Sequence, residues 1–377
     1  AVQAANGTNS KDTDRKAIQD EIDQLNTEID RVAETTKFNE IYLLKGDDGE
    51  KTVNMNAHDA GLKGTLVDNG SGKATFTMKA LSAGDSVSIG GKNYTIGSTA
   101  TDAQKIVDAQ KKAGGKVTVN GVEYTYNDTD SKWNDAAGKE VKIGTGAAAG
   151  EIKIGAGDKV SDGTTTLTAM TDAKDATGAA NADGIDDNDN SVITAEKAYS
   201  LAKDELVAAN HIGDTENTAA VAQDTTNKNV FTITTGSAKV ANTLSFSLHV
   251  GADADMTNKI TVDIDTMNSA NLGIKGLNVT DKNGTAATYA IDAISDAISK
   301  VSSQRSALGA VQNRLEHTID NLDNISENTS SAESRIRDTD MAKEMVNYSK
   351  NNILAQAGQS MLAQANQSNQ GVLSLLQ

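Results

Sequence analysis

The feature that most constrains the fold is a heptad pattern near the end of the chain, centred on the stretch LGAVQNRLEHTIDNL. Apolar residues recur there at unbroken intervals of seven, and further apolar residues widen the same face. This spacing is typical of a long helix that packs against other helices as in a coiled coil. The pattern predicts a helix of roughly 35 residues, on the order of 50 Å long at 1.5 Å per residue. Its seam consists of Ile294, Val301, Leu308, Leu315 and Leu322, with Val311 and Ile325 in the second heptad position and Ile298 and Ile319 beside them.

A second, shorter seam lies near the start of the chain and predicts a helix over about residues 14–33. Its apolar residues are spaced 4, 3, 4 and 3 apart, and Asp12, Thr13 and Asp14 offer caps and favourable N-terminal charge. The two seams are expected to pack together. Because the C-terminal seam is longer than this one, we expect a further helix from a segment preceding Ala1, so that the chain is a fragment. The residues of the shorter, N-terminal seam are Ile18, Ile22, Leu25, Ile29 and Val32.

Between about Lys45 and Asn283 the hydrophobic period changes from helical to alternating. The stretches DSVSIGGKNYTIG and GKVTVNGVEYTYN each carry alternating apolar residues around a Gly-Gly or Asn-Gly pair, a strong hairpin signal. The intervening TDAQKIVDAQKKAGG predicts a short helix that ends at Gly114, and a second helix is expected over residues 194–210. Further strands are predicted at 141–143, 152–154, 230–234, 244–250 and 260–264. The middle of the chain is therefore expected to be mainly β.

The last part of the chain changes character again. Ser330 and Glu333 offer a capping box for a new helix. From Asn351 to Gln377 there is no charged residue, and ten of these 27 residues are Asn or Gln. An uncharged amphipathic helix of this kind favours burial among other helices, where amides can pair with one another. The residues expected at such an interface are Ile353, Leu354, Ala357, Met361, Leu362, Val372, Leu373 and Leu376.

Composition narrows the classes of partner. The formal charge of −17 argues against nucleic acid or an anionic membrane surface as the main partner. No run of 18 apolar residues exists, so no membrane insertion is predicted; the ten amides also count against the tail as a membrane helix. The chain has no Cys, which excludes disulfides and thiolate sites, and no Pro, which excludes slow prolyl isomerisation in folding.

The sequence predicts no catalytic, cofactor or metal site. The four histidines are far apart and form no HExxH motif. In GDSVSIGGKN, Asn93 follows Lys92 where a phosphate loop requires Ser or Thr. The stretch DDNDNSVITAEK has the first spacings of a calcium loop, but Ser191 replaces the Gly and Lys197 the final Glu. A solvated acidic loop is the favoured interpretation.

Both ends of the chain resemble bacterial flagellin. The stretch from RSALGAVQNRLEHTIDNL through SAESRIRDTDMAKEM and ILAQAGQSMLAQANQ to VLSLLQ is similar to the family's C-terminal region, and AVQAANGTNSKDTDRKAIQDEIDQLNTEIDRVAETTKFN to the end of its N-terminal region. Together these stretches cover roughly 130 residues around a variable insert. The resemblance implies an α+β multidomain protein, with long coiled-coil-like helices from both chain ends and a mainly β insert.

The resemblance also implies a domain organisation. Residues 1–46 would form the N-terminal part of the middle helical domain, with a strand or hairpin after the helix. Residues 47–284 would form a variable, surface-exposed insert of one or two subdomains. Residues 285–329 would form the long C-terminal helix of the middle domain, and 330–377 the C-terminal helix of the inner filament-core domain. The N-terminal helix that pairs with this last helix in the family lies outside the given sequence.

A filament subunit for motility, located outside the cell, is the function that the resemblance implies. Its partners would be other flagellin subunits, an export chaperone, and filament cap or junction proteins. The family's middle domain is recognised by Toll-like receptor 5, and Glu21, Ile291 and Leu308 fall at similar positions; for Leu308, packing in the seam is the competing role. The alternative function is a non-polymerising flagellar junction protein or surface adhesin.

Overall fold

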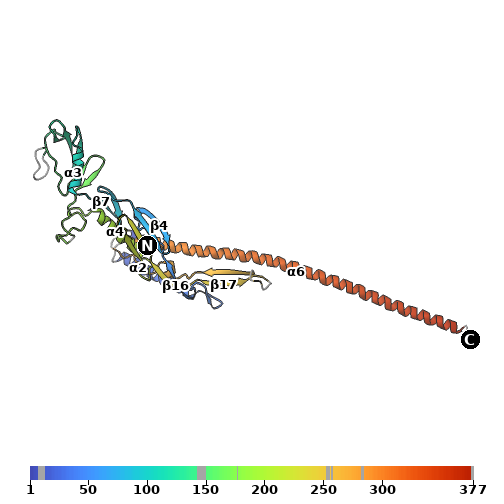
Figure 1. Ribbon diagram of the computed structural model, residues 1–377. Helices are drawn as coiled ribbons and strands as arrows, with labels where there is room; N and C mark the ends of the chain where they lie inside the picture. Colours follow the sequence, from blue (N-terminus) through green and yellow to red (C-terminus); the bar gives the residue numbers. More distant parts are fainter. Residues whose placement is uncertain are drawn as a thin grey trace. The chain divides into compact units, whose positions relative to one another are not determined.

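The computed structural model describes residues 1–6, 13–141, 150–175, 177–251, 255, 258–281 and 284–374. The chain divides into two compact units. The first unit comprises Ala1–Ser245 with Asp263–Arg305, and the second comprises Phe246–Val262 with Ser306–Gln377. A short helix near the N-terminus, a long C-terminal helix and a β-rich middle confirm the predicted α+β class (Figure 1).

Helix α2 spans Asp14–Thr35 in the first unit, where the short heptad seam predicts a helix. It follows the short helix α1, Val2–Ala5. Strands β1, Lys37–Phe38, and β2, Ile41–Tyr42, then form a hairpin in which Phe38 pairs with Ile41. The two turn residues, Asn39 and Glu40, both have positive φ, as a tight turn between twisted antiparallel strands requires.

The main core of the first unit lies between a four-stranded sheet and helix α4, Ala195–Asn210. The sheet order is β14-β15-β5-β4, so neighbouring strands come from distant parts of the chain. Phe76, Phe231, Ile233 and Leu206 are fully buried between the sheet and the helix. The strands are β4, Gly64–Gly70; β5, Lys73–Met78; β14, Ala220–Gln223; and β15, Val230–Thr234.

The first predicted hairpin is present as β6, Ser86–Ile89, and β7, Lys92–Ile96. The short strand β13, Val192–Ile193, joins β7 in parallel and leads directly into α4. The second predicted hairpin is β8, Lys116–Val119, and β9, Val122–Asn127. Asn120 and Gly121 have φ of 49° and 83°, so the Asn-Gly pair forms the two-residue turn between these strands.

Helix α3, Ala100–Ala109, lies between the two hairpins and ends five residues before the predicted stop at Gly114. It belongs to the core of a five-stranded sheet of order β10-β9-β8-β11-β12, around the fully buried Trp133. The added strands are β10, Lys132–Asp135; β11, Lys159–Ser161; and β12, Thr166–Thr168. Residues 152–154 are not a strand of this sheet, and the strand expected at 141–143 falls largely outside the described residues.

Two further pairs of strands complete the β structure of the described residues. Strand β3, Asp47–Asn54, pairs with β16, Ser237–Asn242, and β17, Leu244–His249, is in a sheet with β18, Lys259–Ile264. The short helix α5, Ser269–Leu272, follows.

Helix α6 runs without interruption over Thr285–Ser374, from the first unit into the second (Figure 1). The helix start expected at Ser330 is therefore not found. No Gly or Pro occurs between residues 319 and 351 to end a helix, and Arg337 and Glu333 form an ion pair of 2.8 Å one turn apart in this part of α6.

Candidate assembly surface

A ladder of polar side chains fixes α2 within the first unit. Gln19 donates from Nε2 to the Leu277 carbonyl at 2.7 Å and accepts from the Val279 amide at 2.8 Å. Asn26 donates to the Ile274 carbonyl at 3.1 Å. These residues recur at helical spacing on α2, so they bind one segment of chain along one face of the helix.

Both ends of this ladder are charged. Asp30 accepts the Ser269 amide at 2.7 Å and the Ser269 hydroxyl at 2.9 Å. Arg15, only 1% exposed, donates from Nε to the Ala4 carbonyl at 3.0 Å and from a terminal nitrogen to the Asp281 carbonyl at 2.9 Å. Residues 269–281 are thus tied to α2 along its length.

Sequence reasoning missed this ladder because it followed apolar residues alone. Residues 268–281 have neither a helical nor an alternating pattern, and they were assigned to the insert. The available signal was the recurrence of Arg15, Gln19, Asn26 and Asp30 at intervals of four, seven and four beside the apolar seam.

The seam on α2 divides into covered and exposed residues. Ile22 is 9% exposed, and Ile18 and Ile29 are half-buried against the same core. Leu25 and Val32 are 56% and 40% exposed. Residues 269–281 and the start of α6 cover one side of α2 and leave the apolar side chains of Leu25 and Val32 exposed. Phe38, Ile41 and Tyr42 of the β1–β2 hairpin are exposed too.

The first turns of α6 meet this core through alanine. Ala287, Ala290, Ala293 and Ala297 are buried at helical spacing, and Ile294 packs beside them as a half-buried residue. Val301 is 36% exposed. Small side chains allow the backbone of α6 to approach the core closely, which is why the contact is not made by the larger seam residues.

Polar contacts join the first turns of α6 to the β-rich part of the first unit. The buried Tyr289 hydroxyl donates to a carboxylate oxygen of Glu205 on α4, and burial raises the pKa of Tyr289 well above its usual range. Lys300 donates to the Asn271 carbonyl at 2.8 Å, and burial lowers the pKa of its ammonium group. Asp296 accepts from Asn56 at 2.8 Å.

In the second unit, the rest of the long seam is incompletely covered. Leu308, Val311, Leu315 and Leu322 are half-buried, whereas Ile319 and Ile325 are 56% and 50% exposed. Residues 246–262 belong to the same compact unit, and Ile260 there is 2% exposed. The packing role predicted for these seam residues stays a prediction.

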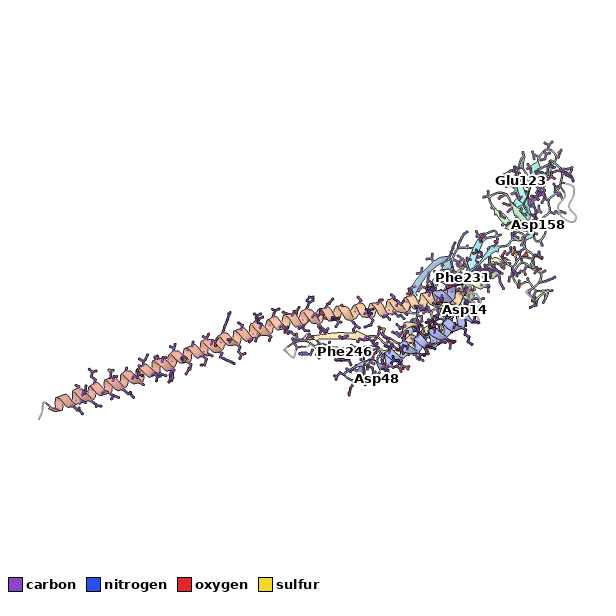
Figure 2. The ribbon with its side chains drawn as sticks, turned by 180° about the vertical axis from the view of Figure 1, so that it is seen from behind. Asp14, Asp48, Glu123, Asp158, Phe231 and Phe246 are labelled. Carbon is purple, nitrogen blue, oxygen red and sulfur yellow. The ribbon has the colours of Figure 1, made fainter. Side chains whose placement is uncertain are left out.

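Side chains stand out from α6 on all sides (Figure 2), and those beyond residue 340 include several large, exposed apolar ones. At 100° per residue, Met341, Met345, Val346, Tyr348, Ile353, Leu354, Met361 and Leu362 are distributed around the whole helix, and each is at least 58% exposed. Met345, Val346, Ile353 and Leu354 line a shallow groove with Ser349 and Lys350. So many exposed large apolar side chains on one segment mark a surface suited to contact with other protein.

The remaining residues expected at this interface are placed as follows. Ala357 is exposed on α6. The side chains of Val372 and Leu373 lie outside the described part of the chain, as does the whole of Leu376. The residues that the resemblance implies as receptor contacts divide between the units: Glu21 is exposed and Ile291 half-buried in the first, and Leu308 is half-buried in the second.

The acidic loop before α4 is structural in character. Asp186 is buried and accepts backbone amides of Thr171, Asn188 and Asp189 at 2.6–2.9 Å. Within the described residues, no three His, Cys, Asp or Glu side chains are placed to hold a metal ion. No helix in the described part of the chain is both long and apolar enough to cross a membrane.

Comparisons with known proteins match both ends of the chain to one family. Residues 1–48 match the bacterial flagellin N-terminal helical region, and residues 291–376 match the bacterial flagellin C-terminal helical region. The flagellin of Bacillus subtilis is 49% identical over 156 residues, which cover 36% of this chain and 51% of that protein. High identity is therefore found over about a third of the chain.

Other relatives match the chain along its whole length. The flagellin of Clostridium tyrobutyricum is 32% identical over 373 residues, which cover 98% of this chain and 75% of that protein. The polar flagellin B/D of Vibrio parahaemolyticus is 32% identical over 377 residues, which cover all of this chain and 75% of that protein. With helical regions matched at both ends and such relatives spanning the middle, this chain belongs to the bacterial flagellin family.

Proposed function

We propose that the chain is a structural subunit of the bacterial flagellar filament, which assembles through its helical ends. The observation that carries the proposal is the set of large apolar side chains exposed on α6 between Met341 and Leu362, which overlaps a stretch without charge that begins after Lys350. Such a surface is unfavourable in water and suited to burial among neighbouring helices. The family relationship supports the same role.

The test is filament formation by bacteria that carry this protein as their flagellin, in the full form their gene encodes. Met361→Asp places a charge where Met361 is 74% exposed and should abolish filaments seen by electron microscopy. Val67→Asp, at a 52% exposed apolar residue of β4, is the matched control and should leave them intact. Normal filaments with Met361→Asp would contradict the proposal.

The β-rich part of residues 47–284, without the segment 269–281 that binds α2, is proposed to be displayed on the outside of the filament. This proposal is supported by two hydrophobic cores in that part of the chain. One lies at the four-stranded sheet around Phe231, and the other at the five-stranded sheet around Trp133. Antibodies raised against the β8–β9 hairpin should decorate intact filaments along their length. Decoration of only broken ends would contradict outward display.

The further partners are an export chaperone before secretion and cap or junction proteins at the filament ends. The exposed apolar residues of α6 support the chaperone proposal, because an unassembled subunit needs that surface covered. Co-purification of the subunit with a flagellar chaperone, lost on deletion of 341–374, is the expected result. Equal recovery of the complex without that segment would refute it.

Recognition by Toll-like receptor 5 is proposed through Glu21, Ile291 and Leu308. Glu21 is exposed on α2 and carries the sharpest test. Glu21→Ala should weaken receptor binding by the subunit, whereas Glu34→Ala, at another exposed acid of α2, should not. Equal binding by both variants would refute this contact.

The alternative, a junction protein or adhesin that does not polymerise, shares the helices but predicts no filament. Electron microscopy of the same cells separates the two. Filaments built from this subunit alone exclude the alternative.

A further inference from the structure

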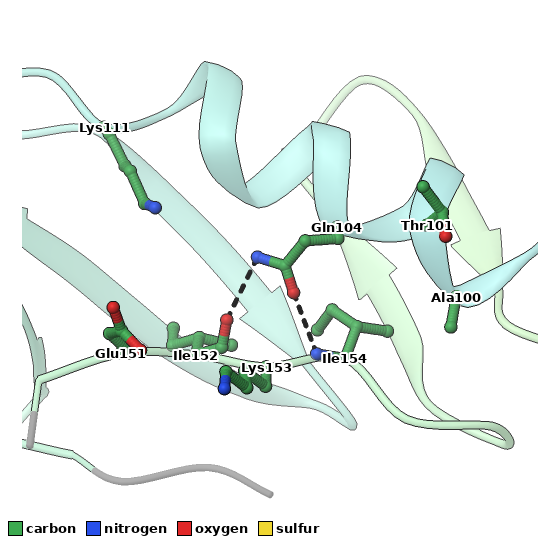
Figure 3. A pocket seen from close by; sticks show the side chains of 8 residues that line it. All are labelled: Ala100, Thr101, Gln104, Lys111, Glu151, Ile152, Lys153 and Ile154. Atoms are coloured by element: carbon green, nitrogen blue, oxygen red, sulfur yellow. Dashed lines mark hydrogen bonds between the residues drawn. The ribbon is translucent and has the colours of Figure 1, made fainter. Parts of the chain in front are cut away.

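One side chain of α3 binds residues 152–154 at two points. Gln104 Nε2 donates to the Ile152 carbonyl at 3.0 Å, and Gln104 Oε1 accepts from the Ile154 amide at 2.9 Å (Figure 3). A neighbouring strand offers a backbone segment the same combination of one donor and one acceptor. The Gln104 amide therefore takes the place of a strand along this edge.

The bound segment covers the core around the five-stranded sheet. Ile152 is 3% exposed and belongs to the same buried cluster as Trp133, which is 1% exposed. The Trp133 amide donates to the Gly150 carbonyl at 3.2 Å, so the segment begins beside the indole-bearing strand. The Trp133 ring stands edge-on to Tyr126, with 5.2 Å between ring centroids.

A cleft of about 400 Å³ lies between α3 and this segment (Figure 3). Its lining includes Thr101, Lys111, Glu151 and Lys153, together with Gln104 itself. The segment thus has a hydrated side as well as the side that Ile152 buries. A segment with few buried contacts opens at lower free energy than the elements of the core.

We propose that residues 151–154 form a strap over the core around Trp133, and that the Gln104 amide is the latch of this strap. Ile152 takes part in a single β-bridge but in no strand of the sheet, so opening of the strap leaves the ladders between β10, β9, β8, β11 and β12 intact. Opening releases Ile152 and gives solvent access to the indole. Because the Gln104 latch can release, the strap can open while the five-stranded sheet stays folded.

Trp133 is the single tryptophan of the chain, so its fluorescence reports the strap in the full-length protein. Gln104→Met keeps the length of the side chain but removes both hydrogen bonds. Acrylamide quenching of Trp133 should rise, and exchange of the Ile154 amide should become about tenfold faster, as expected for the loss of hydrogen bonds of this kind. Lys105→Met, at a side chain 72% exposed on the same helix, is the matched control.

Gln104→Glu tests the latch within one molecule. At neutral pH its carboxylate has no donor for the Ile152 carbonyl, so the strap should be open. Below about pH 4 the protonated carboxyl again offers a donor and an acceptor, and quenching should fall towards the wild-type value. Wild-type quenching and Ile154 exchange in Gln104→Met would overturn the proposal. Quenching independent of pH in Gln104→Glu would overturn it too, even if Gln104→Met fails to fold.

Discussion

Gln19 of α2 and Val279 are joined by a hydrogen bond of 2.8 Å, in which the side-chain carbonyl of Gln19 accepts the Val279 amide. Nε2 of the same Gln19 side chain donates to the Leu277 carbonyl. One side chain therefore satisfies two backbone groups in residues 273–281, which form neither helix nor strand. Side chains of α2 therefore form hydrogen bonds to this backbone that, within a helix or a sheet, other backbone groups would form.

Gln19→Ala should destabilise the first unit by about 1–3 kcal/mol, because it leaves these two backbone groups without their partner. Gln24→Ala, at an exposed glutamine of the same helix, should change stability by less than about 0.5 kcal/mol. Chemical unfolding followed by circular dichroism measures both. Equal losses in the two variants would mean that the ladder does not stabilise the fold.

The two sides of the α2 seam should respond differently in the free chain. Ile22→Ala should cost about 2–5 kcal/mol, because Ile22 is 9% exposed in the core. Leu25→Ala should cost less than about 0.5 kcal/mol, because Leu25 is 56% exposed. Denaturant titrations of the purified chain give both values. A large loss for Leu25→Ala would show that Leu25 is covered in solution.

Asp265 makes the stability of the first unit depend on pH in the acid range. Its carboxylate accepts from Lys51 at 2.7 Å, and this hydrogen bond, with another from Thr243, lowers the pKa of Asp265. A carboxyl group with a lowered folded-state pKa stabilises the fold above its unfolded pKa of about 3.9 and loses that effect as pH falls through the folded value. The stabilisation at pH 7 should be below about 1 kcal/mol, because the pair is partly exposed.

Asp265→Asn should therefore be less stable than the wild type at pH 7, and the difference should shrink as the pH falls below about 4. Asp263→Asn, at an exposed acid of strand β18 two residues earlier, is the control. Thermal melts at a series of pH values measure both. A difference that grows on acidification would have the wrong sign for this account.

The sequence carried enough information for the local elements. Gly90-Gly91 and Asn120-Gly121 identified two hairpins because few other residue pairs allow two consecutive positive φ angles at low cost. Ile18 to Val32 identified α2 because helical periodicity is a local property. The uncharged end of α6 likewise suggested burial.

The rest could not be predicted because it depends on contacts between distant parts of the chain. Strand β5 pairs with β15, so that Phe76 lies opposite Phe231, and no local pattern contains that pairing. The heptad seam identified the apolar side of α2 but not the segment of the chain that packs against it. Polar residues such as Gln19 and Asp30 decide which side residues 269–281 cover, and they leave Leu25 exposed.

The most direct test of the account is amide hydrogen exchange over residues 351–371 of α6, compared between the free subunit and the filament. Every residue of this stretch is exposed in the structure. The stretch also contains Gly358 and Gly371, and each glycine weakens a helix by about 1 kcal/mol relative to Ala. The account predicts fast exchange in the free subunit and strong protection in the filament. Strong protection in the free subunit, or fast exchange in the filament, would contradict assembly through this surface.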